Sequence, residues 1–250
     1  MDLVISSATH RSGSTLLQRL FNARKETLIW GENGGCLTDF CKILDNTRRH
    51  AGFKHRKAYF NNGEDANQWI ACMTPPKHEV DAVMIQTVRN FHEELYMKNY
   101  NNKHDLIGYK EVRYGKKELE LLRKCYPNCT IILLVRNPID VWKSLPNMKG
   151  LIKTYGSLKG FTRVWNVRVN SYLELCGSDP NMHFVKYEDI VTQKTGTINF
   201  IKQVGHLEDK DINPVLSKKI NSTSKPLPED KIKFIMKQCG PTMKKIGYLP

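Results

Sequence analysis

Several features that many proteins carry are missing from this 250-residue sequence. None of the seven cysteines falls in a Cys-x-x-Cys pair and their number is odd, which argues against a zinc ribbon or a dithiol redox site. No uncharged run approaches the roughly 18 residues of a transmembrane helix. The apolar segment 3–8 is too short for the core of a signal peptide. We therefore expect reduced thiols and a cytoplasmic protein without membrane contact.

Internal repeats and low-complexity linkers are absent as well. The length is at the upper end of what one hydrophobic core usually serves. Hydrophobic residues make up 40% of the chain and charged residues 26%, which is typical of a globular protein. We expect a single domain over residues 1–250.

Acidic residues are scarce beside basic ones. There are 25 Asp and Glu against 39 Lys and Arg, a formal net charge of +14. Such a charge attracts polyanions, whether nucleic acid or a multiply charged small ligand, and a solvated lysine-rich surface explains it equally well. One local cluster has Asp45 as its single acid, and it is either a solvated face or a funnel for an acidic acceptor. Its basic members are Lys42, Arg48, Arg49, Lys54, Arg56 and Lys57.

Apolar strands alternate with helical segments along the chain. We predict strands at 3–8, 106–110, 130–135 and 183–186, and helices at 14–24, 80–96, 116–125, from Pro138, 161–175 and 195–204. Continuous apolar strands separated by helices indicate an α/β fold, with a P-loop-like parallel sheet flanked by helices on both faces. Segment 45–105 is polar and breaks this rhythm, and we interpret it as an inserted helical cap over the site.

The first strand is followed by a variant of the nucleotide-binding loop G-x-x-x-x-G-K-[ST]. Gly13 and Thr15 keep the second glycine and the final hydroxyl, whereas Ala8 and Ser14 replace the first glycine and the lysine. A helix N-terminus still binds an anion there, but without the lysine a magnesium-bound triphosphate loses its clamp. The side chains available to an anion are Arg11, Ser12, Ser14 and Thr15.

A second anion site is predicted at the end of strand 130–135. Arg136 ends this strand, Asn137 and Pro138 are typical of a helix start, and Ser144 lies within the helix that follows. Ligands of parallel sheets bind at the carboxyl ends of the strands, so Arg136 should share a crevice with the first loop. Two anion sites in one crevice predict a ligand with phosphates at both ends.

These segments resemble the sulfotransferases that use 3'-phosphoadenosine-5'-phosphosulfate (PAPS). Residues 11–17, which include Leu16, are similar to the family's loop for the 5'-phosphosulfate. Residues 131–136 with Ser144 are similar to its 3'-phosphate motif, and 184–190, with Tyr187, to its "YEDL" segment. The resemblance extends over residues 3–227. It implies sulfuryl transfer from PAPS, with PAP as product and no metal, to a hydroxyl or amine. We expect a small-molecule acceptor and no nucleic-acid partner.

The layout is most similar to protein-tyrosine sulfotransferases and their bacterial relatives. The resemblance implies that Glu32 is the base and that Lys110 lies near the transferring sulfuryl group. The segment 221–226 is similar to a shorter version of a loop that closes over the cofactor, which adds the candidates Ser222, Thr223 and Lys225. Arg11, Lys110 and Ser222 are expected to stabilise the leaving oxygen.

Other interpretations of the same residues stay open at this point. Glu32 could cap a following helix, Lys110 could be a surface lysine on an edge strand, and Tyr187 could serve packing alone. His10 is a reserve base because an ordinary histidine titrates near neutral pH. The rival functions are a P-loop kinase or NTPase, which the missing lysine disfavours, and a basic nucleic-acid-binding protein, for which no module is recognised.

Overall fold

The structure is a computed structural model that describes residues 1–52, 66–68, 74–145, 154–218 and 226–249. A five-stranded sheet in the order β2-β3-β1-β4-β5 forms its centre, and every neighbouring pair is parallel. The strands are β1 (Leu3–Ser7), β2 (Thr27–Trp30), β3 (Leu106–Glu111), β4 (Thr130–Val135) and β5 (Met182–Lys186). The predicted α/β class is confirmed. The short edge strand β2 escaped prediction.

Helices connect the strands and extend the chain beyond them. Six lie within a few residues of their predicted bounds: α1 (Ser14–Phe21), α4 (Lys77–His92), α5 (Lys116–Cys125), α6 (Pro138–Ser144), α8 (Leu158–Ser178) and α10 (Thr195–Gly205). The remaining described ones are α2 (Cys36–His50), η1 (Ala66–Gln68), the π-helical turn η2 (Glu93–Met97) that continues α4, α9 (Tyr187–Val191), α11 (Asp209–Leu216) and α12 (Glu229–Lys245). At α6, the Asn137 side chain accepts from the backbone N–H of Ile139 at 3.0 Å, as its capping position predicted.

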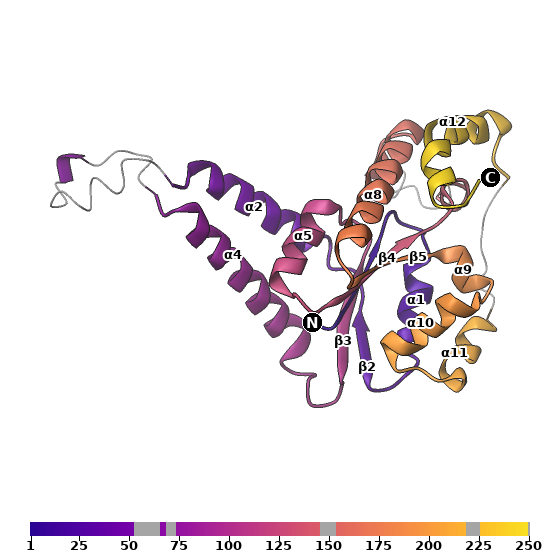
Figure 1. Ribbon diagram of the computed structural model, residues 1–250, viewed down its shortest axis with the longest axis horizontal. Helices are drawn as coiled ribbons and strands as arrows, with labels where there is room; N and C mark the ends of the chain where they lie inside the picture. The colour runs from indigo at the N-terminus through magenta and orange to yellow at the C-terminus, as the bar shows by residue number, and fades with distance from the viewer. Residues whose placement is uncertain (53–65, 69–73, 146–153, 219–225, 250) are drawn as a thin grey trace.

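Alternating side chains of the buried strands pack into two separate cores. Leu3 and Ile5 of β1 belong to the core under α1, α10 and α11. Val4, between them, belongs to the core under α2, α4, α5, α8 and α12. Successive side chains of a strand point to opposite faces, so a continuous apolar strand needs cover on both sides. Figure 1 shows these two helical layers on either side of the sheet.

Helices α2 and α4 form an antiparallel pair that projects from the body of the molecule (Figure 1). Arg48 on α2 and Asp81 on α4 join them through an ion pair of 3.2 Å. The two helices of this arm include residues 45–50 and 77–92 of segment 45–105, and they agree with the helical character expected there. That the segment covers the site stays a prediction. No helix in the described ranges is both long and apolar enough to cross a membrane.

Candidate active site

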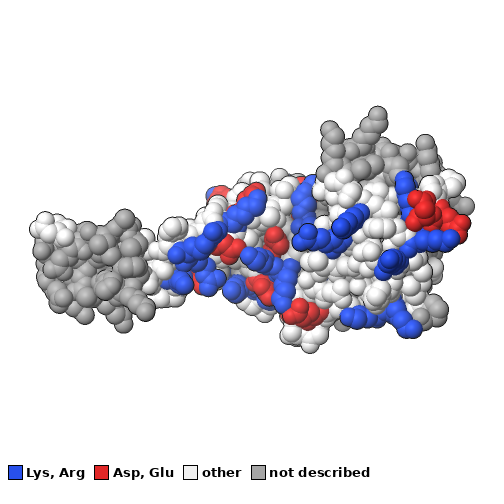
Figure 2. Space-filling view, turned by 90° about the horizontal axis from the view of Figure 1, so that it is seen from above, with Lys and Arg blue, Asp and Glu red and all other residues white. Residues whose placement is uncertain are grey.

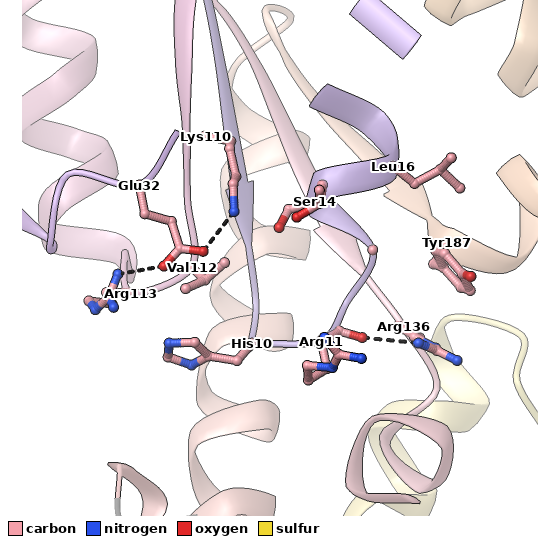
Figure 3. Close-up of a pocket in the computed structure, with 12 residues that line it drawn as sticks. His10, Arg11, Ser14, Leu16, Glu32, Lys110, Val112, Arg113, Arg136 and Tyr187 are labelled. Carbon is pink, nitrogen blue, oxygen red and sulfur yellow. Dashed lines mark hydrogen bonds and ion pairs between the residues drawn. The ribbon is translucent and has the colours of Figure 1, made fainter. Parts of the chain in front are cut away.

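A cavity of about 290 Å³ opens where the strands end (Figure 3). Each of the five strands is followed by a residue that lines it: His10 after β1, Glu32 after β2, Val112 after β3, Arg136 after β4 and Tyr187 after β5. The parallel sheet brings all these carboxyl ends to one edge. The other lining residues are Arg11, Gly13, Ser14, Thr15, Leu16, Lys110 and Arg113.

The loop between β1 and α1 approaches the cavity in a conformation that requires glycine. Gly13 has a φ of 91°, and a Cβ placed on it would lie 2.1 Å from Cδ2 of Tyr187. Because this space is taken, only a residue without a side chain lets the loop pass so close to β5. Arg11 also has a positive φ, 65°. The hydroxyls of Thr9 and Ser12 lie 3.0 Å apart and tie the two sides of the turn together.

Arg136 links this loop to the end of β5. Its Nη1 donates to the backbone carbonyl of Arg11 at 3.1 Å, as Figure 3 shows. Its guanidinium carbon lies 4.4 Å from the centre of the Tyr187 ring, a cation–π contact. Its buried Nε has no hydrogen-bond partner within the described residues. A buried unpaired donor is costly, so this edge of Arg136 suits an additional acceptor.

Glu32 is held between two cations on the opposite side of the cavity. Lys110 Nζ donates to its Oε1 at 2.6 Å and Arg113 Nη1 to its Oε2 at 3.0 Å. Burial alone would raise the pKa of Glu32, but the hydrogen bonds and charges of Lys110 and Arg113 outweigh it and lower the pKa. The carboxylate therefore stays ionised at neutral pH, as a proton acceptor must.

Two of the alternative interpretations are wrong. Strand β3 lies between β2 and β1, and Lys110 is only 7% exposed, so it is not a surface lysine on an edge strand. The start of α2 is capped by Asn33, whose Oδ1 accepts from the backbone N–H groups of Gly35 and Cys36. Glu32 does not serve as that cap, because its oxygens face Lys110 and Arg113.

His10 also lines the cavity, and burial determines its protonation state. Burial, together with the charge of Arg113, lowers the pKa of His10 from 6.5 to about 4. Its Nδ1 lies 3.0 Å from the hydroxyl of Tyr155, which also accepts from the His10 backbone N–H. The imidazole is thus neutral at pH 7, and one of its nitrogens is already engaged.

Ser144 is buried at the end of α6, where its hydroxyl donates to the Val141 carbonyl at 2.7 Å, and it does not line the cavity. Ser222, Thr223 and Lys225 fall outside the described residues.

Sequence reasoning missed two arginines at this site. Arg113 lies two residues beyond β3, and its place at a strand's carboxyl end was a signal that could have found it. Arg168, in the middle of α8, donates to the backbone carbonyls of Ala8, Val112 and Arg113 at 2.7–2.9 Å. The sequence around Arg168 gives no comparable indication, because folding alone brings the three carbonyl groups to the middle of this helix.

The charges around the cavity favour an anionic ligand. Among the described lining residues, Arg11, Lys110, Arg113 and Arg136 are cations and Glu32 is the single acid. Lys and Arg side chains also spread over the body and the arm in the view of Figure 2. Within the described ranges, no group of three or more His, Cys, Asp or Glu residues is placed to hold a metal ion.

Comparisons with known proteins agree on one family. A family model described as "Sulfotransferase family" matches residues 5–211. The sulfotransferase domain from the curacin biosynthetic pathway is similar in structure, with a TM-score of 0.54 at 16% identity over 96% of this chain and 97% of that one. The sulfotransferase domain of the Synechococcus PCC 7002 olefin synthase gives 0.53 at 15% identity, over 90% and 81%.

A third similar structure is the sulfotransferase STF9 from Mycobacterium avium. Its TM-score is 0.51 at 12% identity, over 97% of this chain and 76% of that one. At such identities the likeness concerns the fold. No curated protein sequence gives a significant match.

Proposed function

Because the chain belongs to the sulfotransferase family, we propose that it transfers a sulfuryl group from PAPS to a hydroxyl or amine of a small acceptor. The observation that carries the proposal is the placement of an anion-binding loop, Arg136 and the Glu32–Lys110 pair around one cavity. The acceptor class and the cytoplasmic location expected from the sequence stay predictions.

The residues present fit a ligand with an anionic group at each end. On one side the helix start at Ser14 and the close backbone approach at Gly13 make a cradle that a Cβ would fill. On the other side Arg136 presents a buried Nε that lacks a partner among the described residues. Helix N-termini and arginines are the usual protein partners of phosphate and sulfate groups. The first would hold the 5'-phosphosulfate of PAPS and the second its 3'-phosphate.

In the proposed reaction Glu32 takes the proton from the acceptor. PAPS supplies the sulfuryl group, which passes to the acceptor oxygen or nitrogen as the bond to the 5'-phosphate breaks. Lys110 and Arg11 supply positive charge where negative charge develops on the leaving oxygen. Holding these groups around one cavity accounts for catalysis by positioning and electrostatics, and no metal takes part in the proposal.

The proposal is tested first by binding. We expect PAP to bind without magnesium and ATP to bind much more weakly, because Ser14 stands where a triphosphate loop has its lysine. Isothermal titration calorimetry with both nucleotides, with and without magnesium, measures this. Mass spectrometry of a panel of hydroxylated and amino compounds incubated with PAPS then identifies the acceptor. Magnesium-dependent ATP binding tighter than that of PAP would overturn the proposal in favour of a kinase or NTPase.

A further inference from the structure

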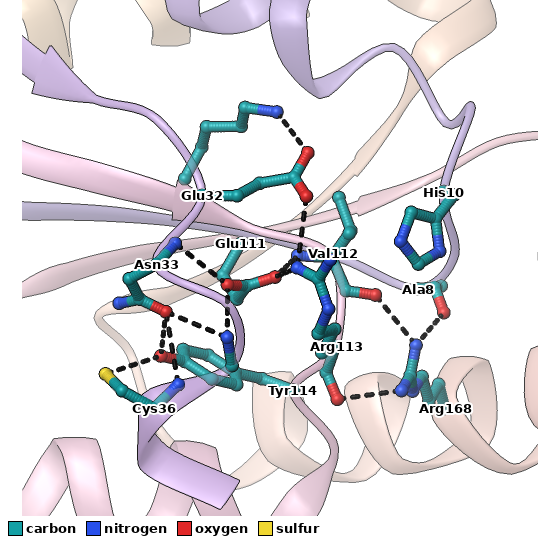
Figure 4. Close-up of polar contacts among 12 residues, drawn as sticks. Ala8, His10, Glu32, Asn33, Cys36, Glu111, Val112, Arg113, Tyr114 and Arg168 are labelled. Atoms are coloured by element: carbon teal, nitrogen blue, oxygen red, sulfur yellow. Dashed lines mark hydrogen bonds and ion pairs between the residues drawn. The ribbon is translucent and has the colours of Figure 1, made fainter. Parts of the chain in front are cut away.

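Glu111 is a buried carboxylate with an unusually full set of partners (Figure 4). Its Oε2 accepts from the backbone N–H groups of Asn33 at 3.2 Å and Gly35 at 2.8 Å. Its Oε1 accepts from the N–H of Val112 at 2.7 Å and from Arg113 Nη1 at 2.6 Å. A buried charge is stable only when it is paired and hydrogen-bonded, so this carboxylate fixes the groups around it.

Arg113 is constrained from three directions. Its Nη1 bridges Glu111 Oε1 and Glu32 Oε2, as the dashed lines in Figure 4 show. Its aliphatic stem packs on the backbone of Gly35, where an added Cβ would lie 2.9 Å from Arg113 Cδ. Its backbone carbonyl accepts from Arg168 Nη2 at 2.7 Å. The guanidinium therefore has little freedom to leave Glu32.

Lys110, the other partner of Glu32, has a competing task in the proposed reaction. Its ammonium is a point charge on a flexible stem, and it contacts Glu32 at 2.6 Å from inside the cavity. A sulfuryl group in the cavity would draw this ammonium away from the carboxylate. Arg113 lines the cavity too, but it is also tied to Glu111, which is fully buried and does not line the cavity. We therefore expect the contact between Arg113 and Glu32 to persist.

We propose that Arg113, anchored by Glu111, is a positioning residue that keeps the Glu32 carboxylate oriented toward the acceptor while Lys110 serves the sulfuryl group. This inference rests on the proposed function. Arg113 contacts Glu32 and Glu111 rather than the reacting atoms. Because it also lines the cavity, its loss should slow transfer far more than it weakens nucleotide binding. Among the described residues, Lys110 and Arg113 are the cations that contact Glu32, and His10 and Tyr155 also interact with it electrostatically. The His10 ring is neutral at pH 7.

The experiment uses Arg113→Met, Arg113→Lys and, as a matched control, Arg19→Met on the exposed surface of α1. For Arg113→Met we expect single-turnover sulfuryl transfer to slow by about 10- to 100-fold, the scale of a misplaced reacting group, with PAP affinity within about threefold of wild type. The acid limb of the pH–rate profile should move to higher pH, because a cation that favours ionised Glu32 is gone. Arg113→Lys should restore that limb but only part of the rate, since a lysine ammonium is a point charge on a flexible stem and fixes the carboxylate less well than a planar guanidinium.

A second readout is independent of activity. Carbon-13 NMR titration of the Glu32 carboxyl should show a higher pKa in Arg113→Met than in wild type and Arg19→Met. Unchanged rate and titration in Arg113→Met overturn the inference, as does a loss of PAP affinity equal to the loss of rate. If Arg113→Met does not fold, Glu111→Gln is used instead. It should move the acid limb of the pH–rate profile to higher pH, by less than we expect for Arg113→Met, and an unmoved limb also overturns the inference. The proposed function is refuted if the wild-type protein neither binds PAP nor transfers a sulfuryl group. If the wild type does both but the pKa of Glu32 is the same in Arg113→Met, only the role of Arg113 is refuted.

Discussion

At the scale of single residues, Arg136 shows how one side chain joins folding to binding. Its guanidinium stacks on Tyr187 and donates to the Arg11 carbonyl, so it holds the loop between β1 and α1 against the start of α9. Its Nε is buried and unpartnered among the described residues. One guanidinium can hold these contacts and accept a further anion because its donors form a planar fork.

If Arg136 binds the 3'-phosphate, its replacement should mainly weaken the binding of ligands that carry this group. We expect Arg136→Ala to weaken PAP binding by roughly 1.5–3 kcal/mol, the range for a hydrogen bond to a charged group. Binding of adenosine 5'-phosphosulfate, which lacks the 3'-phosphate, should change much less. Calorimetry with the two ligands makes the comparison. Equal losses for both would assign Arg136 to the scaffold of the loop instead of to the 3'-phosphate.

Glu32 offers the sharpest residue-level test of the proposed chemistry. Glu32→Gln keeps the shape and removes the proton acceptor, so kcat should fall by about 10²- to 10⁴-fold while PAP affinity stays near wild type. Lys110 and Arg113 lower the pKa of Glu32. Protonation of Glu32 should therefore slow the wild-type enzyme only at a pH below the range in which an ordinary glutamate titrates. Single-turnover kinetics across pH measure both effects. A wild-type rate in the mutant would transfer the role of base to His10.

At the scale of elements, the turn between β1 and α1 depends on one backbone conformation. Gly13 places the loop against Tyr187 with a positive φ and sits at the N-cap of α1. The nearby Ser12 and Ser14 are buried, and Ser14 lines the cavity. The loop is thus specified by the fit between two segments that are 174 positions apart in sequence, Gly13 and Tyr187.

Gly13→Ala should damage this element, because the new methyl group meets the Tyr187 ring and the φ is unfavourable for alanine. We expect destabilisation of about 1–3 kcal/mol, from strain and overpacking together, and weaker PAP binding. Gly196→Ala on α10 is the matched control, since nothing lies within 4 Å of its added Cβ. In a helix this change should be neutral or stabilising. Thermal melts that rank the two variants alike would contradict the packing argument.

At the scale of the whole molecule, the larger core contains an ionisable side chain for which the described residues provide no hydrogen-bond partner. His92, at the end of α4, is fully buried among aromatic rings that include Tyr109 and Tyr126. Neither ring nitrogen has a hydrogen-bond partner within the described residues. Burial lowers the pKa of His92 from 6.5 to about 4, so the folded protein keeps this ring neutral where the unfolded chain protonates it.

This difference predicts how stability depends on pH. Between pH 6.5 and 4 the unfolded state binds the proton at His92 and the folded state does not, so the free energy of unfolding should fall by about 1 kcal/mol per pH unit as pH decreases. His92→Phe should remove this contribution, while that of buried His10 remains. Urea unfolding of both proteins at pH 7 and pH 5 measures the slopes. If the free energy of unfolding depends on pH in the same way in both proteins, the pKa of His92 does not differ between the folded and unfolded states.

The sequence by itself determined the class of fold and most of the cavity's polar lining. Strands β1 and β4 are continuous apolar segments, which only a sheet covered on both faces accommodates. Arg11, Gly13, Lys110 and Arg136 lie at or beside strand ends, and parallel topology brings such positions to one edge. For Arg11, Gly13 and Arg136 the inference depends on local patterns and one general rule of topology, so it needs no knowledge of long-range contacts, whereas Lys110 was implied by the family resemblance.

Only the tertiary structure decided how these residues pair. Strand β2 has four residues with alternate positions half-buried, too weak a local pattern to stand out. Glu111 directly follows Lys110 in the sequence, yet it is buried and accepts hydrogen bonds from the backbone of Asn33 and Gly35, 78 and 76 residues away. The same fold turns Lys110 toward Glu32. Alternation along β3 sends neighbouring side chains to opposite faces, and what each face meets depends on segments that folding alone brings together.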